Sequence, residues 1–177
     1  MGKPRTPLPV KLFFALMTRE EALLEEVEEL LKKRWGKIDY SSTLFPFHYT
    51  DYYQEEMGRD LKKKFLSFQR LISPEEIVEI KLFSNSVEGK YMLQGKRRIN
   101  LDPGYVNYDQ VVLVSTKMSP HRIYMGKGIY GEVTLYFYQG HFHAFPWTYP
   151  DYKEHIEVFE EMRSIFKQEV KKFVREG

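Results

Sequence analysis

The chain has 177 residues, enough for a hydrophobic core of ordinary size, and its net charge of +2 is too small for a dedicated nucleic-acid binder. It contains no cysteine, which excludes disulfides and thiolate metal sites and makes the reducing cytoplasm the expected location. No apolar run approaches the roughly 20 residues of a membrane-spanning helix, so no membrane partner is expected. Abundant Lys and Glu give a thermophile-like composition.

The first part of the chain alternates strand and helix patterns. Residues 1–9 hold three prolines and predict a flexible N-terminus, while 10–17 are apolar and predict a buried central strand. Thr18 and Glu21 have the spacing of a capping box, which predicts a helix that ends at Gly36. Further along we expect a strand over 38–47, an aromatic-rich loop over 48–58, a strand over 61–72 whose start is also compatible with a helix, and a helix from Ser73-Pro74 to about Gly89.

The second part of the chain is richer in strand patterns. Strands are predicted near 97–101, 110–116 and 121–125, followed by a hairpin of 132–138 with 141–145 across Gln139-Gly140. A helix over about 151–175 carries an apolar stripe of Tyr152, Ile156, Phe159, Phe166, Val170 and Phe173. The element order predicts an α+β fold: one domain over 10–177, with a ferredoxin-like (split β-α-β) core extended by C-terminal β-hairpins and a long C-terminal helix.

Polar and aromatic residues between 96 and 152 indicate the wall of a binding site. Arg97 and Arg98 suit phosphate or carboxylate, but on an extended strand they face opposite sides, so only one can point into a given site. Asp102-Pro103-Gly104-Tyr105 has the composition of a turn. Lys117, His121 and Arg122 lie at neighbouring strand ends, where they form either an anion cradle or a charged hairpin tip.

Two glycine- and aromatic-rich segments have competing interpretations. Gly126-Lys127-Gly128 precedes a strand rather than a helix, so it favours a hairpin connection over a phosphate loop. Pro146 to Tyr152 is either an aromatic wall for a base or sugar, or a rigid junction in which Trp147 fills the core. Thr148 and Asp151 both suit a helix cap, and Asp151 has Glu154 at capping-box spacing.

The histidines suggest two further kinds of chemistry. His141 and His143 share a strand face, but a metal would need a third ligand, Glu132 or Asp151, and exposed hairpin histidines are the preferred interpretation, so no metal site is predicted. His48-Tyr49-Thr50 is one half of the signature of two-histidine phosphoesterases, and the second H-x-T is missing.

Several segments together resemble one family. They are Asn100 to Tyr105, Ser115-Thr116-Lys117, His121 to Tyr124, Gly128-Ile129-Tyr130, Glu132 to Leu135 and Trp147 to Tyr152. Over nearly the whole chain they resemble an uncharacterised prokaryotic family of the domain-of-unknown-function type, often labelled "GTP-binding protein". The resemblance implies no activity. A guanine signature is not complete, since Ser115-Thr116-Lys117-Met118 lacks its aspartate.

The sequence predicts binding of a phosphorylated ligand, a nucleotide or an RNA end, by a basic and aromatic site within residues 96–152. The candidate ligand-binding residues are Arg97, Arg98, Asn100, Asp102, Lys117, His121, Arg122, Glu132, Trp147, Tyr149 and Asp151. His121 and His48 are the catalytic candidates, and His121 is the better proton carrier. One alternative is an interaction domain or homodimer through Tyr49, Tyr52, Tyr53, Tyr136 and Tyr138. Another is an incomplete two-histidine phosphoesterase. Catalysis and any cofactor are left open.

Overall fold

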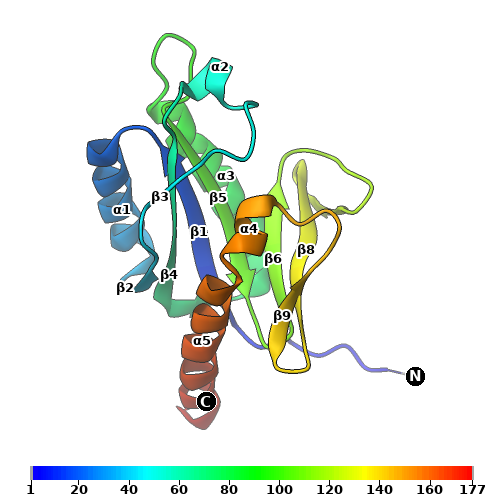
Figure 1. Ribbon diagram of the computed structural model, residues 1–177. Coiled ribbons are helices and arrows are strands. Elements are labelled where there is room, and N and C mark those ends of the chain that lie inside the picture. The colour runs from blue at the N-terminus through cyan, green and yellow to red at the C-terminus, as the bar shows by residue number, and fades with distance from the viewer. Residues whose placement is uncertain (1, 177) are drawn as a thin grey trace.

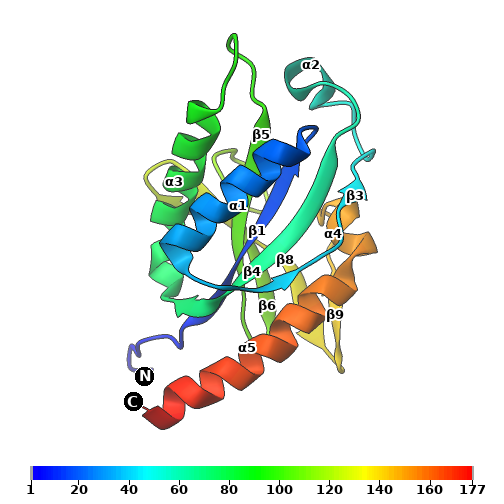
Figure 2. The same cartoon turned by 90° about the vertical axis from the view of Figure 1, so that its left-hand side faces the viewer.

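The computed structural model describes residues 2–176 and the side chains of residues 2–173. Within this part the fold is α+β, with helices on both faces of a nine-stranded sheet in which every ladder is antiparallel (Figures 1 and 2). The strand order is β2-β4-β1-β5-β6-β8-β7, with β3 also on β4 and β9 also on β8. The described helices include none long and apolar enough to cross a bilayer.

The central strand is β1 (Val10–Thr18), which lies between β4 (Lys62–Ile72) and β5 (Ile99–Val106). Leu12, Phe14 and Leu16 join the core under α1 (Glu21–Trp35) and α3 (Ile77–Lys90). Phe13 and Ala15 join the opposite core under α4 (Pro150–Glu154) and α5 (Ile156–Glu176). Because helices cover both faces, both sets of alternate side chains are apolar. The prediction of a buried central strand is confirmed.

The first helix has the predicted buried stripe of Leu24, Val27, Leu31 and Trp35 and ends at Gly36, whose φ is 87°. The predicted capping box is wrong. Thr18 is the last residue of β1 and pairs with Ile99 of β5. Its hydroxyl donates to the Arg98 carbonyl at 2.7 Å and accepts from the Glu20 N–H at 3.1 Å, so it links strand to strand and does not cap the helix.

The single strand predicted over 38–47 is two short strands, β2 (Ile38–Ser41) and β3 (Phe45–Pro46), both on β4. The break begins at Ser42, whose hydroxyl accepts from the Phe65 N–H at 2.9 Å in place of a backbone carbonyl. The loop after β3 contains a short helix, α2 (Gln54–Met57). β4 is strand from its start. The Ser73 N–H donates to Glu76 Oε1 at 2.8 Å, which confirms the predicted start of the second helix, here through a 3₁₀ turn over Pro74–Glu76.

The predicted turn at Asp102-Pro103-Gly104-Tyr105 is wrong, because these residues lie inside β5. Pro103 is tolerated there because β6 (Gln110–Ser115) pairs with β5 only from Gly104 onward, which leaves one side of the strand unpaired at Pro103. At Gly104 the neighbouring residues leave no room for a side chain. A Cβ on it would lie 2.4 Å from the Val112 carbonyl oxygen and 2.4 Å from the Phe13 ring.

The later strands extend the first sheet. β8 (Ile129–Tyr138) starts earlier than predicted and pairs with β6, β7 (Ile123–Gly126) and β9 (His141–Ala144). Lys127 and Gly128 form the turn between β7 and β8, with φ of 50° and 77°, which confirms the hairpin connection. The hairpin across Gln139 and Gly140 is also confirmed.

The predicted C-terminal helix is two helices, because α4 ends before His155 and α5 begins at Ile156. Asp151 is not the cap, since α4 starts at Pro150. Tyr152, Phe159, Phe166 and Val170 are buried, and Ile156 is partly buried against the same core. Phe173 is 55% exposed, so the predicted apolar stripe ends before it.

A buried ion cluster joins α5 to the sheet. The Lys11 ammonium, 0% exposed, lies 2.5 Å from Asp39 Oδ2 and 2.6 Å from Glu169 Oε2, and donates to the Phe68 carbonyl at 2.9 Å. Burial raises the pKa of Glu169 to about 7. The negative charge of Asp39 also raises this pKa, whereas the hydrogen bond and charge of Lys11 lower it. Lys11 is therefore the shared cation of two acidic side chains, Asp39 and Glu169.

Candidate functional site: a cavity where the sheet opens

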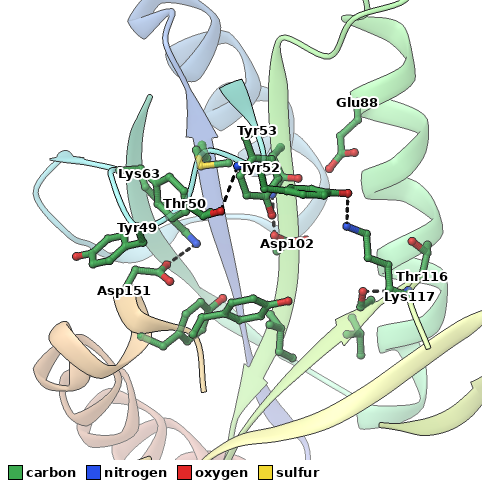
Figure 3. A pocket seen from close by; sticks show the side chains of 18 of the residues that line it. Tyr49, Thr50, Tyr52, Tyr53, Lys63, Glu88, Asp102, Thr116, Lys117 and Asp151 are labelled. Atoms are coloured by element: carbon green, nitrogen blue, oxygen red, sulfur yellow. Dashed lines mark hydrogen bonds and ion pairs between the residues drawn. The ribbon is translucent and has the colours of Figure 1, made fainter. Parts of the chain in front are cut away.

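A cavity lies where β5 and β6 separate. The two strands pair at three positions, from Val106–Val111 to Gly104–Leu113. Beyond these, Asn100 and Asp102 of β5 and Val114 and Ser115 of β6 line a cavity of about 610 Å³. The segment from β3 to α2 forms one side, and the start of α4 forms another (Figure 3). Since α3 lies beside the same opening, its polar side chains also reach the cavity.

A buried ion pair joins β4 to α4 at the cavity. Lys63 Nζ lies 2.5 Å from Asp151 Oδ2, and the two side chains are 8% and 3% exposed. The ammonium also lies 5.1–5.5 Å from the ring centres of Phe47, Phe65 and Tyr152. These rings add cation–π attraction to the ion pair. Asp151 therefore fixes the start of α4 against the sheet.

A second ion pair joins α3 to β5. Lys81 Nζ donates to Asp102 Oδ1 at 3.0 Å and to the Leu101 carbonyl at 3.1 Å, while Asn100 Nδ2 donates to Asp102 Oδ2 at 2.7 Å. Burial raises the pKa of Asp102, but the charges of Lys81 and Lys63 and the two hydrogen bonds outweigh it, so the pKa lies below its ordinary value. Asp102 is therefore a carboxylate at neutral pH.

Arg97 connects α2 to α3 and β5. Its Nε and Nη2 both donate to the Glu56 carboxylate at 2.7 Å, and its Nη1 donates to Asn100 Oδ1 at 2.9 Å and to Glu88 Oε2 at 3.3 Å. The hydrogen bonds from Arg97 lower the pKa of Glu56. Burial raises the pKa of Glu88, although its Oε1 accepts from the Leu101 N–H at 2.7 Å. The bidentate pair with Glu56 closes one end of the cavity.

Tyrosines surround the mouth of the cavity. Lys117 Nζ donates to the Tyr52 hydroxyl at 2.7 Å and lies 4.2 Å from the centre of its ring (Figure 3). Tyr49 donates to Glu154 Oε2 at 2.6 Å, and burial together with this hydrogen bond raises its pKa to about 12. Burial also raises the pKa of Tyr53. The hydroxyls of Tyr49 and Tyr53 are therefore neutral at physiological pH.

The structure brings together most, but not all, of the predicted site residues. Seven of them line the cavity: Arg97, Asn100, Asp102, Lys117, Arg122, Tyr149 and Asp151. Arg98 points elsewhere and forms an ion pair with Glu20, as expected if only one of the two arginines can face a given site. His121, Glu132 and Trp147 do not line the cavity.

The expected cradle of Lys117, His121 and Arg122 is only partly formed. Arg122 Nε donates to Glu132 Oε2 at 2.7 Å, and His121 Nε2 lies 3.0 Å from the same oxygen. Because the Glu132 carboxylate is 1% exposed, Arg122 mainly compensates a buried charge, and the His121 ring makes a polar contact with the same oxygen. Arg122 also donates to the Tyr149 hydroxyl at 3.0 Å, so it holds the cavity wall in place.

Trp147 fits neither interpretation made from the sequence. It is 38% exposed, so it does not fill the core, and it lies outside the cavity. Its ring stacks between His121 at 5.2 Å and Phe145 at 4.6 Å, and its N–H donates to the Val133 carbonyl at 3.1 Å. Trp147 therefore packs on His121, which contacts the buried Glu132.

The remaining histidines lie outside the cavity. His48 is exposed and stacks on Tyr49, with ring centres 4.7 Å apart. His141 lies 3.6 Å from Glu160, and His143 contacts the Tyr138 carbonyl at 3.0 Å. Among the described residues, no group of three or more His, Cys, Asp or Glu side chains is arranged to hold a metal ion.

Sequence reasoning missed Lys63, Lys81, Glu88 and Tyr53, which all line the cavity. A signal for the α3 pair is present in the sequence. Lys81 and Glu88 fall at helical spacing from Ile77, Ile80 and Ser84, so they belong to the buried stripe of α3. Lys63 lies between Lys62 and Lys64 in a strand, where alternation turns the middle residue to the opposite face.

The fold and the site define an α+β protein with a polar, tyrosine-lined cavity at an opening in its sheet. The model of one family, Domain of unknown function (DUF4416), matches residues 8–166. The chain belongs to this family. Searches of the curated proteins and of the solved structures found no match.

Proposed function

We propose that the cavity binds a phosphorylated ligand of nucleotide size, with Lys117 contacting the phosphate. Four of the cations that line the cavity have carboxylate partners: Lys63, Lys81, Arg97 and Arg122. The Lys117 ammonium has only the Tyr52 hydroxyl and ring as partners among the residues that the structure describes. Its charge has no ion-pair partner among the described residues and lies beside the hydroxyl-bearing Ser115 and Thr116, and this is the observation that carries the proposal.

The paired cations support the same ligand class. An ammonium has three donor positions, and Lys81 uses two of them while Lys63 uses one for Asp151. The third donor of Lys81 remains for a ligand oxygen, whereas the Lys63 ammonium is enclosed by three rings and acts on the cavity through its charge. A volume of about 610 Å³ lies in the range of small-molecule sites, roughly 300–1,000 Å³. The rings of Tyr52, Tyr53 and Tyr149 offer faces for a base.

The wider proposal concerns fold and location. The order β2-β4-β1-β5, with α1 and α3 between strands on one face, supports a ferredoxin-like core within a single domain over 10–177. The lack of cysteine supports the cytoplasm. The label "GTP-binding protein" makes guanine nucleotides the first ligands to test.

The interaction alternative loses part of its support. Tyr49, Tyr52 and Tyr53 line the cavity, so of the five tyrosines only Tyr136 and Tyr138 remain as exposed candidates outside it, at 36% and 57% exposure. The phosphoesterase alternative depends on His48, which lies outside the cavity. The ligand-binding proposal uses the cavity itself and is therefore preferred.

The test is thermal unfolding with GTP, GMP, ATP and inorganic phosphate, each with and without Mg²⁺. A ligand at 100 times its dissociation constant adds about 2.7 kcal/mol to the free energy of unfolding. We expect stabilisation by one nucleotide class, reduced in Lys117→Ala. The control is Lys127→Ala, which removes an exposed lysine in the β7–β8 turn. No stabilisation by any of these ligands, or equal loss in both variants, would contradict the proposal.

A further inference from the structure

A second cavity of about 460 Å³ lies next to the first. It is formed by α2, the residues after β1 and the loop that leads from α3 to β5. The views in Figures 1 and 2 both place α2 and this loop at the same end of the molecule. Glu56 and Arg97 line both cavities, so their bidentate ion pair is the wall between them. A ligand too long for the first cavity would extend past this ion pair into the second cavity.

The charges of the second cavity favour an anionic chain. Two of its cations, Arg97 and Arg98, are paired with Glu56 and Glu20. Arg19 and Lys96 are exposed and form no ion pair with another described residue. Their donors can therefore bind anions without first losing a carboxylate partner. The lining also includes Glu55, which forms no ion pair with another described residue, so four cations (Arg19, Lys96, Arg97 and Arg98) and three carboxylates (Glu20, Glu55 and Glu56) leave a net charge of +1.

The shape and remaining lining of the second cavity agree with nucleic acid. The Arg19 guanidinium lies over Gly58, where a Cβ would come within 2.9 Å of its Nη1, so no side chain separates it from α2. Leu93 is 60% exposed beside Gln94, which gives an apolar surface next to an amide. Single-strand binding sites combine a positively charged groove with aromatic rings on which bases stack; here the second cavity supplies the cations, and the rings are the tyrosines of the first cavity.

We propose that the second cavity binds the phosphodiester backbone of a single-stranded oligonucleotide whose terminal nucleotide occupies the first cavity. This inference rests on the proposed function and specifies the ligand as a nucleic-acid end. Arg19 and Lys96 contact the phosphates that follow the terminal nucleotide, whereas Lys117 contacts the terminal phosphate. Such backbone contacts add affinity without reading the base sequence.

The test is calorimetric titration of a 5′-phosphorylated mononucleotide and of a matched pentanucleotide, as RNA and as DNA. The proteins are the wild type, the double variant Arg19→Ala/Lys96→Ala and Lys117→Ala. Wild-type protein is expected to bind the pentanucleotide at least about tenfold more tightly than the mononucleotide, since contacts to two further phosphates are added. The double variant is expected to lose this gain and keep the mononucleotide affinity. For the pentanucleotide, the slope of log K against log salt concentration should become shallower by about 1.4, since each lost phosphate contact on a single strand removes roughly 0.7 from it.

The outcomes separate the two proposals. Equal binding of both ligands by the wild type, or an unchanged gain in the double variant, overturns the second-cavity inference alone. Binding of neither ligand overturns both proposals. Thermal unfolding of the double variant without ligand checks the fold, and both replaced side chains are exposed. Lys127→Ala serves as the control for loss of a surface charge.

Discussion

The buried pair of Lys63 and Asp151 gives the sharpest prediction about stability. In Asp151→Asn the Lys63 ammonium, 8% exposed and enclosed by three rings, loses its counter-charge. In Lys63→Met the Asp151 carboxylate, 3% exposed, loses its only described ion-pair partner. Removing one partner of a buried ion pair lowers the free energy of unfolding by about 3–5 kcal/mol. Because this pair lines the cavity, we expect the lower end, about 3 kcal/mol, for each single variant.

The double variant distinguishes charge pairing from simple loss of packing. With both charges removed, no buried ion remains uncompensated, so the double variant should be less destabilised than the sum of the singles by at least about 2 kcal/mol. Urea unfolding followed by circular dichroism measures each value, provided that the m-value is unchanged. Lys62→Met is the matched control, since the exposed pair of Lys62 with Glu21 should contribute at most about 1 kcal/mol. Additive single effects, or singles below about 1 kcal/mol, would refute the reasoning.

Three further changes test other parts of the structure. Gly104→Ala should lower the free energy of unfolding in urea by about 1–3 kcal/mol, because the new Cβ meets the Val112 carbonyl. Gly89→Ala, in an open helical position, should raise it by about 0.5–1 kcal/mol, and the opposite order of the two variants would contradict the packing. The folded-state pKa of Glu169 is raised, so its contribution to stability is full below its unfolded pKa and is lost as pH rises through about 7. Glu169→Gln should flatten this loss, by on the order of 1–3 kcal/mol, and an unchanged pH profile would contradict the shift. Arg122→Ala should cost about 2–4 kcal/mol, since among the described residues buried Glu132 then keeps only its contact with the His121 ring, and a cost below about 1 kcal/mol would contradict this role of Arg122.

Local patterns predicted elements whose partners are close in sequence. The apolar run of β1, the Ser73 helix start and the hairpin at Gln139-Gly140 need only their own residues or near neighbours. The failures involve distant partners. Asp102 to Tyr105 has turn composition, but pairing with β1 holds it as strand, and Thr18 is held in the same sheet by Ile99. Tertiary pairing overrides local propensity at both places.

The site was harder to predict than the fold, because its residues come from segments that meet only in the folded chain. Asp102 and Asp151 were found as candidates, whereas their partners Lys81 and Lys63 were not, since each lies in an element that otherwise has a regular core or surface pattern. Conversely, Trp147 was conspicuous in sequence but packs on His121 outside the cavity. A lysine on a buried stripe was the more informative signal.

The most direct test of the ligand-binding proposal is a nuclear magnetic resonance titration of protein with isotope-labelled tyrosine rings, using GTP and GMP at constant ionic strength. Tyr52, Tyr53 and Tyr149 line the cavity, while Tyr136 and Tyr138 lie on β8 outside it and act as internal controls. We predict saturable shifts of the cavity tyrosines that disappear in Lys117→Ala. Shifts confined to Tyr136 and Tyr138, or no shift at millimolar nucleotide, would contradict the proposal.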